Sequence, residues 1–292
     1  MKKIYIAASA VVLFYAIQVP VSAGLVEDCS SLVSSQQYAK AEAVGHQAIR
    51  KVGNFDAYIC LGRALSNQGK AKEALPIFQA ANDLARGDRD IGVAANWLGN
   101  VFSNLGDYDK ALEHHNRELA VAKRLGNASK EATALNNVAL VYDHKGEFDR
   151  ALRYYEESLR METDECEKTT SLGNIALILN QKGDNKKAIA KLEEAVAINR
   201  RLGNHHSLGQ HLLNLGSLRR QDADLDGALL NLEEGLVFVR QVGDKAWEAS
   251  GQEGLARLRE ARGELPQART AWAQSAIGSS AMGTIAEKPD QA

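Results

Sequence analysis

The sequence predicts an all-α protein, a solenoid of about seven tandem helix-turn-helix units, and three observations lead to this prediction. The 292 residues include only 4 Pro and 6% aromatic residues, while Ala, Leu, Glu, Lys and Arg are abundant, which favours helix over strand. An alanine recurs at intervals of 33 to 40 residues, usually with a bulky residue one helical turn later. A small residue lies twelve positions before each of these alanines. Stacked supersecondary units show such a fixed phase.

The first 23 residues have the composition of a secretory signal peptide. Lys2 and Lys3 precede an uncharged apolar run, and Val21-Ser22-Ala23 supplies the small residues of a cleavage site. We therefore expect a signal peptide over residues 1–23 and a periplasmic or secreted mature protein that starts at Gly24 and does not insert into a membrane. The alternative is an uncleaved anchor, because the run approaches the roughly 20 residues that span a bilayer. The short basic start is typical of bacteria, and a eukaryotic secretory origin remains the alternative.

The recurring alanines, here called the anchor alanines, define one helix of each unit. The small residues twelve positions earlier define the helix before it. Because both have little or no side chain, two antiparallel helices can approach closely at these positions. The anchor alanines are Ala41, Ala74, Ala111, Ala151, Ala188, Ala228 and Ala268, and the small residues are Cys29, Gly62, Gly99, Ala139, Ala176, Gly216 and Ala256.

Glycines mark the end of each predicted helix. A turn glycine lies five residues before most anchor alanines, with Gln36 and Ala223 as the two departures. Gly-Asn or Gly-Asp pairs close most units, where a helix ends in a left-handed residue. The predicted units are 24–54, 55–88, 89–127, 128–167, 168–204, 205–244 and 245–278, followed by a disordered tail at 279–292 that lacks apolar periodicity.

These units resemble the tetratricopeptide repeat, in particular its longer variant of about 40 residues. The resemblance rests on stretches such as Trp97-Leu98-Gly99-Asn100 through Gly106-Asp107-Tyr108-Asp109-Lys110-Ala111, and it covers residues 24–278. It implies a right-handed superhelical solenoid. It also implies that the first helix of each unit lines a concave groove that holds an extended peptide or a partner helix.

Amide side chains repeat on the predicted first helices and are the candidate binding residues. A spaced row of amides can pair with the backbone of an extended ligand, because each offers a donor and an acceptor. The alternative is that the amides bond neighbouring helices and fix the stack. The row in mid-helix is Asn96, Asn100, Asn136, Asn137, Asn174 and Asn214, and the row at the helix ends is Asn67, Asn104, His144, Gln181 and Gln221.

Other chemistry has little support in the sequence. The balance of 35 basic and 37 acidic residues argues against nucleic acid as a partner. The histidine pairs His114-His115 and His205-His206 lack metal-ligand spacing, and no catalytic motif is present, so we expect no enzyme activity, metal or cofactor. We expect a protein-interaction scaffold or adaptor of the bacterial envelope. The alternatives are a peptide-sensing receptor and a self-assembling element that stacks through Trp247, Leu255 and Leu258. The oligomeric state is not predicted.

Two of the three cysteines lie on first helices of adjacent predicted units. Because these helices stack side by side, we expect Cys29 and Cys60 to form a disulfide if the compartment is oxidising. Such a disulfide would connect the first unit to the second, and the alternative is two free thiols. Cys166 then has no partner.

Overall fold

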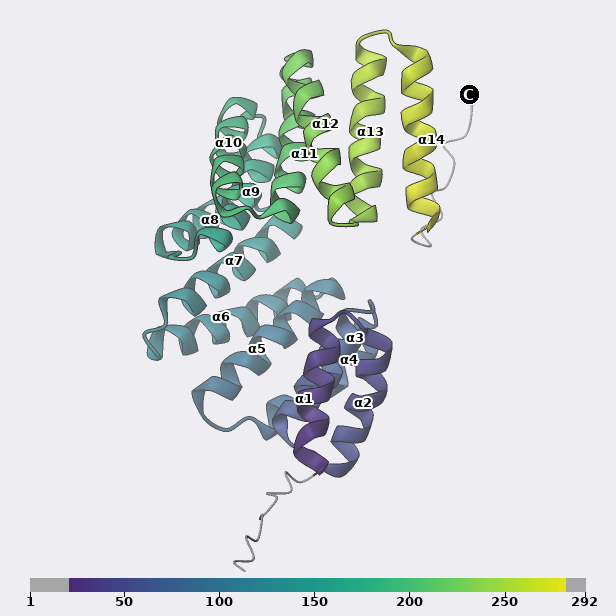
Figure 1. Cartoon of the computed structure of the whole chain (residues 1–292). Coiled ribbons are helices and arrows are strands. Elements are labelled where there is room, and N and C mark those ends of the chain that lie inside the picture. Colours follow the sequence, from purple (N-terminus) through teal and green to yellow (C-terminus); the bar gives the residue numbers. More distant parts are fainter. Residues whose placement is uncertain (1–20, 282–292) are drawn as a thin grey trace, which may run out of the picture. The chain divides into compact units, whose positions relative to one another are not determined.

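The computed structural model describes residues 21–281, and all regular secondary structure in this range is α-helical (Figure 1). The chain divides into an N-terminal unit that ends at Asp90 and a C-terminal unit that begins at Ile91. Residues 1–20 of the predicted signal peptide and residues 282–292 of the predicted tail lie outside the described range. The helices are α1 (Val21–Ser34), α2 (Tyr38–Lys51), α3 (Phe55–Ser66), α4 (Ala71–Leu84), α5 (Gly87–Asn104), α6 (Tyr108–Arg124), α7 (Ala128–His144), α8 (Phe148–Met161), α9 (Glu165–Gln181), α10 (Asn185–Leu202), α11 (His205–Gln221), α12 (Leu225–Gln241), α13 (Lys245–Ala261) and α14 (Leu265–Ala281).

Consecutive helices pair into helix hairpins, from α1 with α2 to α13 with α14, and this confirms the predicted fold class. Two details differ from the prediction. The helix α9 begins at Glu165 rather than after residue 167, because the Asp164 carboxylate accepts hydrogen bonds from the backbone N–H groups of Cys166 (2.7 Å) and Glu167 (3.2 Å) and so caps the helix. The helix α14 continues to Ala281, so the first residues of the predicted tail are helical.

The two helices of a hairpin cross where the sequence places its small residues. Six of the seven anchor alanines are fully buried and Ala268 is 2% exposed. A Cβ atom added at Gly62 would lie 2.5 Å from the ring of Phe78, and one added at Gly99 would lie 2.5 Å from the ring of His115. In these two hairpins the bulky residue after the anchor alanine therefore fills the space that the small residue leaves open. In the next repeat Tyr155 is 1% exposed and shares one apolar cluster with residues of α8, α9 and α10.

Asparagine or aspartate side chains start most of the first helices. In four of the five Gly-Asn and Gly-Asp pairs that end units, the glycine has positive φ and the following polar side chain caps the next helix. The exception is Gly87-Asp88, because α5 already begins at Gly87. For example, the side-chain oxygen of Asn127 accepts a hydrogen bond from the Lys130 N–H at 3.0 Å. Such a cap contributes about 1 kcal/mol. The pair therefore ends one unit and begins the next.

The turn inside each hairpin needs one residue in the left-handed conformation. The five turn glycines have φ between 73° and 81°. Gln36 and Ala223, which replace glycine at this position, have φ of 59° and 64° and are the two non-glycine residues with positive φ in residues 21–281. A left-handed conformation costs a non-glycine residue about 1 kcal/mol. Packing of the two helices therefore imposes the turn even where glycine is missing.

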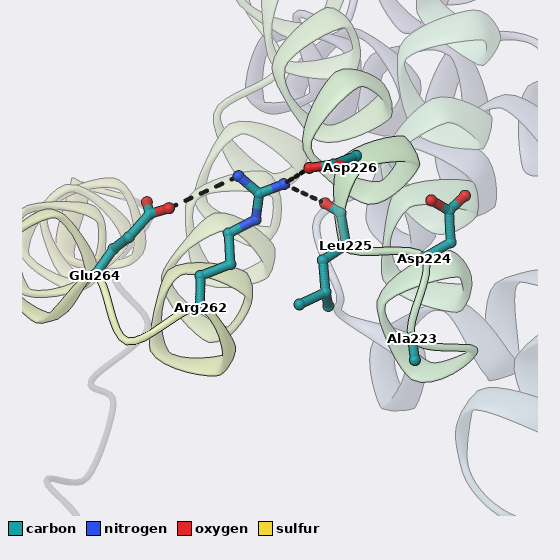
Figure 2. A pocket seen from close by; sticks show the side chains of 6 residues that line it. All are labelled: Ala223, Asp224, Leu225, Asp226, Arg262 and Glu264. Carbon is teal, nitrogen blue, oxygen red and sulfur yellow. Dashed lines mark hydrogen bonds and ion pairs between the residues drawn. The ribbon is translucent and has the colours of Figure 1, made fainter.

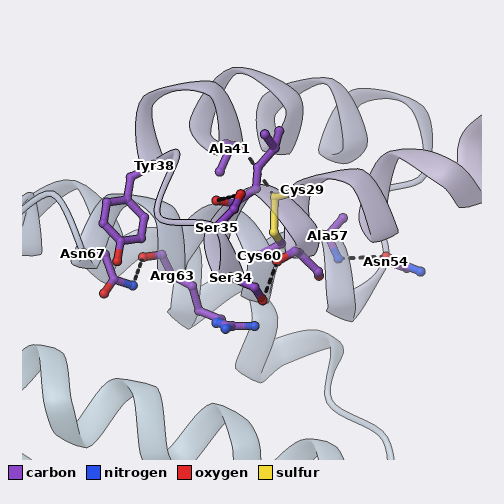
Figure 3. Close-up of a disulfide and its surroundings, with 12 residues drawn as sticks. Cys29, Ser34, Ser35, Tyr38, Ala41, Asn54, Ala57, Cys60, Arg63 and Asn67 are labelled. Atoms are coloured by element: carbon purple, nitrogen blue, oxygen red, sulfur yellow. Dashed lines mark hydrogen bonds between the residues drawn. A yellow bond between two sulfur atoms is a disulfide. The ribbon is translucent and has the colours of Figure 1, made fainter. Parts of the chain in front are cut away.

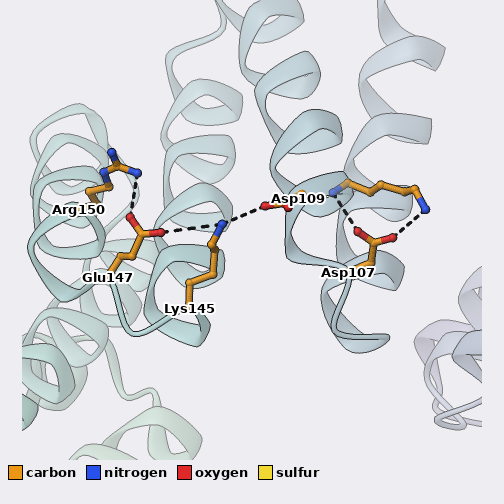
Figure 4. Close-up of polar contacts among 6 residues, drawn as sticks. Asp107, Asp109, Lys145, Glu147 and Arg150 are labelled. Atoms are coloured by element: carbon orange, nitrogen blue, oxygen red, sulfur yellow. Dashed lines mark hydrogen bonds and ion pairs between the residues drawn. The ribbon is translucent and has the colours of Figure 1, made fainter.

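Ion pairs connect the turns of neighbouring hairpins in the C-terminal unit (Figure 4). The Lys145 ammonium lies 2.9 Å from Asp109, and Lys182 pairs with Asp149 in the next repeat. Arg262 pairs with Asp226 at the same two positions further along the chain. The aspartates of these pairs are largely exposed, so solvent screens each pair and its contribution to stability is small. Their regular spacing favours one register of the stack.

A disulfide joins the first helices of the N-terminal unit (Figure 3). It links Cys29 of α1 to Cys60 of α3, and their Cα atoms are 6.2 Å apart. Both cysteines are buried, together with Val33, Ala41 and Ala64. Cys166 is an exposed free thiol. The disulfide therefore covalently connects the first two hairpins.

The three residues named for end-to-end stacking pack inside the last hairpins. Leu255 is 5% exposed and Leu258 is fully buried, and both pack in one apolar cluster with α12, while Trp247 is partly buried against that cluster. These three side chains therefore do not form the exposed surface that the self-assembly alternative requires. Between residues 21 and 281, no helix is both long enough and apolar enough to span a bilayer.

Candidate functional site

The helices α7, α9 and α11 present side chains at the same positions relative to the anchor alanines. On each helix the second residue follows the first by four positions and the third follows the second by three. The last two follow the third by three and by four positions, so all five side chains share one helical face. All are at least partly exposed. We call this set the first-helix surface: Thr133, Asn137, Leu140, Asp143 and His144 of α7, Thr170, Asn174, Leu177, Asn180 and Gln181 of α9, and Gln210, Asn214, Ser217, Arg220 and Gln221 of α11.

The mid-helix amides of α5 and α7 converge on one buried carboxylate. Glu118 of α6 is 6% exposed, and it accepts hydrogen bonds from the Asn96 amide (2.9 Å) and the Asn137 amide (3.4 Å). Its second oxygen also lies 3.2 Å from His115 Nδ1. The Asn100 amide in turn lies 3.4 Å from the Asn96 oxygen. Asn96 and Asn137 therefore connect α5, α6 and α7, which is the structural role that the sequence left as the alternative.

Glu118 was not among the candidate residues, although the sequence carries a signal for it. It lies seven residues after its anchor alanine, where the other units have a small residue. Those residues are Ala48, Ala81, Ser158, Ala195, Gly235 and Ser275. A carboxylate at a position reserved for small side chains indicates a buried polar contact. Its partners were not predictable, because they come from two other helices.

The next repeats use their amides differently. The Asn174 amide donates to the Asn136 oxygen at 3.2 Å, which links α9 to α7. Within the described residues, the side-chain oxygens of Asn137 and Asn174 accept no hydrogen bond, and the side chain of Asn214 makes none. Buried polar groups are normally satisfied, whereas these partly exposed groups remain open to solvent or a ligand. The row thus combines contacts inside the stack with free hydrogen-bonding groups on its surface.

The amide row at the helix ends is exposed. Asn104, His144, Gln181 and Gln221 are the last residues of α5, α7, α9 and α11. The His144 ring stacks on Tyr108 with centroids 5.9 Å apart. Asn67 belongs to the N-terminal unit, where its amide donates to the Arg63 carbonyl at 2.8 Å.

Two charged residues of the first-helix surface were missed by the sequence analysis. Burial raises the pKa of Asp143, an effect that the nearby His144 and a hydrogen bond from Gln181 partly offset. Arg220 forms no ion pair or hydrogen bond within the described residues, and its Nε is buried without a partner. Both occupy the position eight residues before an anchor alanine. Among the fifteen residues of the first-helix surface, they are the two with a carboxylate or a guanidinium group.

A shallow depression lies between the turns of the last two hairpins (Figure 2). Arg262 dominates it, and its guanidinium donates to the Leu225 carbonyl at 3.0 Å and pairs with Asp226. Asp224 caps α12 by accepting a hydrogen bond from the Gly227 N–H at 2.9 Å. Because these polar groups already have partners in the protein, the depression is a contact between repeats.

The two buried histidines serve packing. His115 fills the space beside Gly99, and His211 of α11 lies against Gly173 of α9. One ring nitrogen of His211 is 2.9 Å from the Asn199 amide nitrogen, and Asn199 is fully buried. In the part of the chain that the structure describes, no three His, Cys, Asp or Glu side chains form a group that fits a metal ion.

The neutral state of His211 makes the stability of the C-terminal unit depend on pH. Burial lowers the pKa of His211 to about 4, which the Ser207 carbonyl partly opposes. The pKa of histidine in the unfolded chain is about 6.5. The contribution of neutral His211 to the free energy of unfolding is therefore fully present above pH 6.5 and is lost as the pH falls towards 4. We expect a loss of about 3 kcal/mol between pH 7.5 and pH 4, measured by urea unfolding. A His211→Gln variant should lack this part of the pH dependence; an unchanged dependence would show that His211 does not cause it.

The comparisons with known proteins agree with the described architecture. The tetratricopeptide repeat family model matches residues 90–163 and 167–240, just over half of the chain. The outer dynein arm-docking complex subunit 4 of Danio rerio is 28% identical over 116 residues, which is 39% of this chain and 24% of that protein. The chain therefore matches about a quarter of that relative's length.

Two solved structures show the same fold over most of the chain. A signal transduction ATPase with a tetratricopeptide repeat sensor, from Pyrococcus horikoshii, has a TM-score of 0.71 at 17% identity, covering 90% of this chain and 43% of that one. A Rap protein complexed with competence and sporulation factor has a TM-score of 0.63 at 15% identity, covering 89% and 76%. The repeated small-residue crossings, the stacked hairpins and the family match together show that the chain belongs to the tetratricopeptide repeat family, whose members mediate protein–protein interactions.

Proposed function

We propose that this chain is a non-catalytic scaffold or adaptor that holds an extended peptide segment of a partner protein on the first-helix surface. The observation that carries the proposal is the row of open amide groups on α7, α9 and α11. The free oxygens of Asn137 and Asn174 and the free amide of Asn214 occupy one position in three consecutive repeats. Amides at a regular spacing can hydrogen-bond to a peptide backbone without requiring particular ligand side chains.

Apolar contact is available beside these amides. Leu140 is 37% exposed and Leu177 is 40% exposed, at equivalent positions of α7 and α9. Each lies three residues after an amide of the row, on the same helical face. An extended peptide could therefore place apolar side chains on the leucines while its backbone bonds to the amides.

Two of the amides are already oriented before any ligand binds. Asn137 uses one N–H on Glu118 and Asn174 uses one on Asn136. These contacts hold the side chains and leave their oxygens free. A ligand then does not have to order the side chains, which reduces the entropic cost of binding.

The names of similar proteins support a binding role. One relative is a subunit of a docking complex, and one structural neighbour was solved with a bound factor. We extend this role to the present chain because its open amides lie on helices of the same fold.

We further propose that the protein acts outside the cytoplasm, in the bacterial envelope. The basic and apolar start of the sequence supports export, and the Cys29–Cys60 disulfide suits an oxidising compartment.

Two measurements on protein from the native cell test export. N-terminal sequencing should give Gly24 as the first residue, and non-reducing peptide mapping should recover Cys29 and Cys60 in one linked fragment. A retained Lys2-Lys3 start in the membrane fraction would support the anchor instead. Free thiols at both cysteines would contradict the oxidising compartment.

The amides differ in their contacts, and this separates binding from stability. Asn214→Ala removes no hydrogen bond within the described residues, so we expect partner binding to weaken by about 0.5–1.5 kcal/mol with little change in the melting temperature. Asn137→Ala removes a partner of buried Glu118, so it should also lower the free energy of unfolding by about 1–3 kcal/mol. Quantitative capture from the envelope fraction and thermal unfolding measure the two effects.

Asn116→Ala is the matched control, because Asn116 is an exposed amide on the second helix α6. It should leave capture and stability unchanged. If Asn214→Ala captures as much partner as the wild type, or if Asn116→Ala loses as much as Asn214→Ala, the first-helix surface is not the binding site.

A further inference from the structure

The two unpaired charges of the first-helix surface lie on the same row and have opposite signs. Asp143 of α7, Asn180 of α9 and Arg220 of α11 each lie eight residues before an anchor alanine. The sequence of the row is therefore acid, amide, base across three consecutive repeats. The other twelve members of the first-helix surface are His144 and eleven uncharged polar or apolar residues.

Neither charge has an ion pair within the described residues. Asp143 accepts a hydrogen bond from Gln181 and lies near His144, while burial disfavours its charged form. Arg220 has no ion pair either, and its Nε is buried without a hydrogen-bond partner. Unpaired, partly buried charges cost free energy that a partner of opposite charge would recover.

The basic residues at the hairpin turns, in contrast, have ion pairs. At the hairpin turns, Lys145, Lys182 and Arg262 each pair with an aspartate of the preceding repeat. The protein therefore pairs the charges that connect its repeats, and it leaves Asp143 and Arg220 without an ion pair on the surface that carries the free amides.

The separation of the two charges sets a length for the ligand. Packed helices are about 8–10 Å apart, so two steps from α7 to α11 span roughly 16–20 Å. An extended chain advances about 3.3–3.6 Å per residue, so about five or six residues cover this distance. A peptide of that length can contact the amides of all three helices.

From these observations we propose that the first-helix surface selects an extended peptide segment with a basic group that pairs with Asp143 and an acidic group that pairs with Arg220, about five or six residues apart. This inference rests on the proposed peptide-binding function and adds the charge pattern, length and direction of the ligand. The basic and acidic groups can be side chains or the free ends of a short peptide. Uncharged residues lie between them, facing Asn180 and Leu177.

Selection from a random peptide library tests the charge pattern. Twelve-residue peptides displayed on phage, together with synthetic hexapeptide pools with free or blocked ends, are selected against the mature chain. We expect enriched peptides to share a basic and an acidic residue about five positions apart. Binding that requires free ends would instead assign the charges to the peptide termini. A synthetic peptide of the enriched sequence should lose at least tenfold in affinity for Asp143→Asn and for Arg220→Gln.

The charge-exchanged variant Asp143→Arg with Arg220→Asp gives the strongest test, because it keeps the net charge and should enrich the motif with its two charges in the opposite order. The matched control is Glu156→Arg with Arg160→Glu, an exchange on the exposed face of the second helix α8. It should enrich the wild-type motif. Circular dichroism melting establishes that each variant is folded.

The outcomes separate this inference from the function on which it rests. Enriched peptides that lack the charge pair, or that are the same for wild type and the charge-exchanged variant, would overturn the charge pattern while peptide binding stands. If no peptide is enriched by any variant, both the charge pattern and the peptide-binding function are contradicted.

Discussion

The close approach of two helix backbones inside each hairpin is the constraint on which the rest of the structure depends. Where the approach is closest, one helix has glycine, alanine or cysteine and the other has a buried alanine. A side chain as small as a methyl group at Gly62 or Gly99 would collide with the ring that fills the neighbouring space. Such contacts leave little freedom in the rotation of either helix. Each repeat therefore presents its remaining positions in the same direction.

Because of this regular geometry, residues at the same distance from their anchor alanines lie in a row on the surface. Asn137, Asn174 and Asn214 follow one another on neighbouring helices because their anchor alanines do. Asp143 and Arg220 have an equivalent relation, although they are far apart in the chain. The crossing positions hold the fold together, so the exposed positions can vary in chemistry from repeat to repeat. Glu118 is an exception, since it places a carboxylate at a small-residue position and organises the amides around it.

The sequence predicted the hairpins well because each depends on contacts at fixed short separations, such as Gly99 with His115. The binding residues were harder to predict, because their state depends on other helices. Asn137 was predicted to contact the ligand, but its side-chain N–H group donates to Glu118 inside the stack. Arg220 was missed because a single arginine on a helix face is unremarkable until its lack of a partner is known. Leu258 was named in the self-assembly alternative, but the structure shows that it packs against the preceding hairpin.

Site-specific photo-crosslinking in the native cell tests most directly whether the first-helix surface is the binding site. A photoreactive residue replaces Leu177 on α9 or, as a matched exposed leucine, Leu230 on α12, which is 67% exposed. The account predicts that position 177 forms an adduct with a partner, within one short segment of that partner, and that position 230 forms none. Adducts at position 230 alone, or equally at both positions, would contradict it.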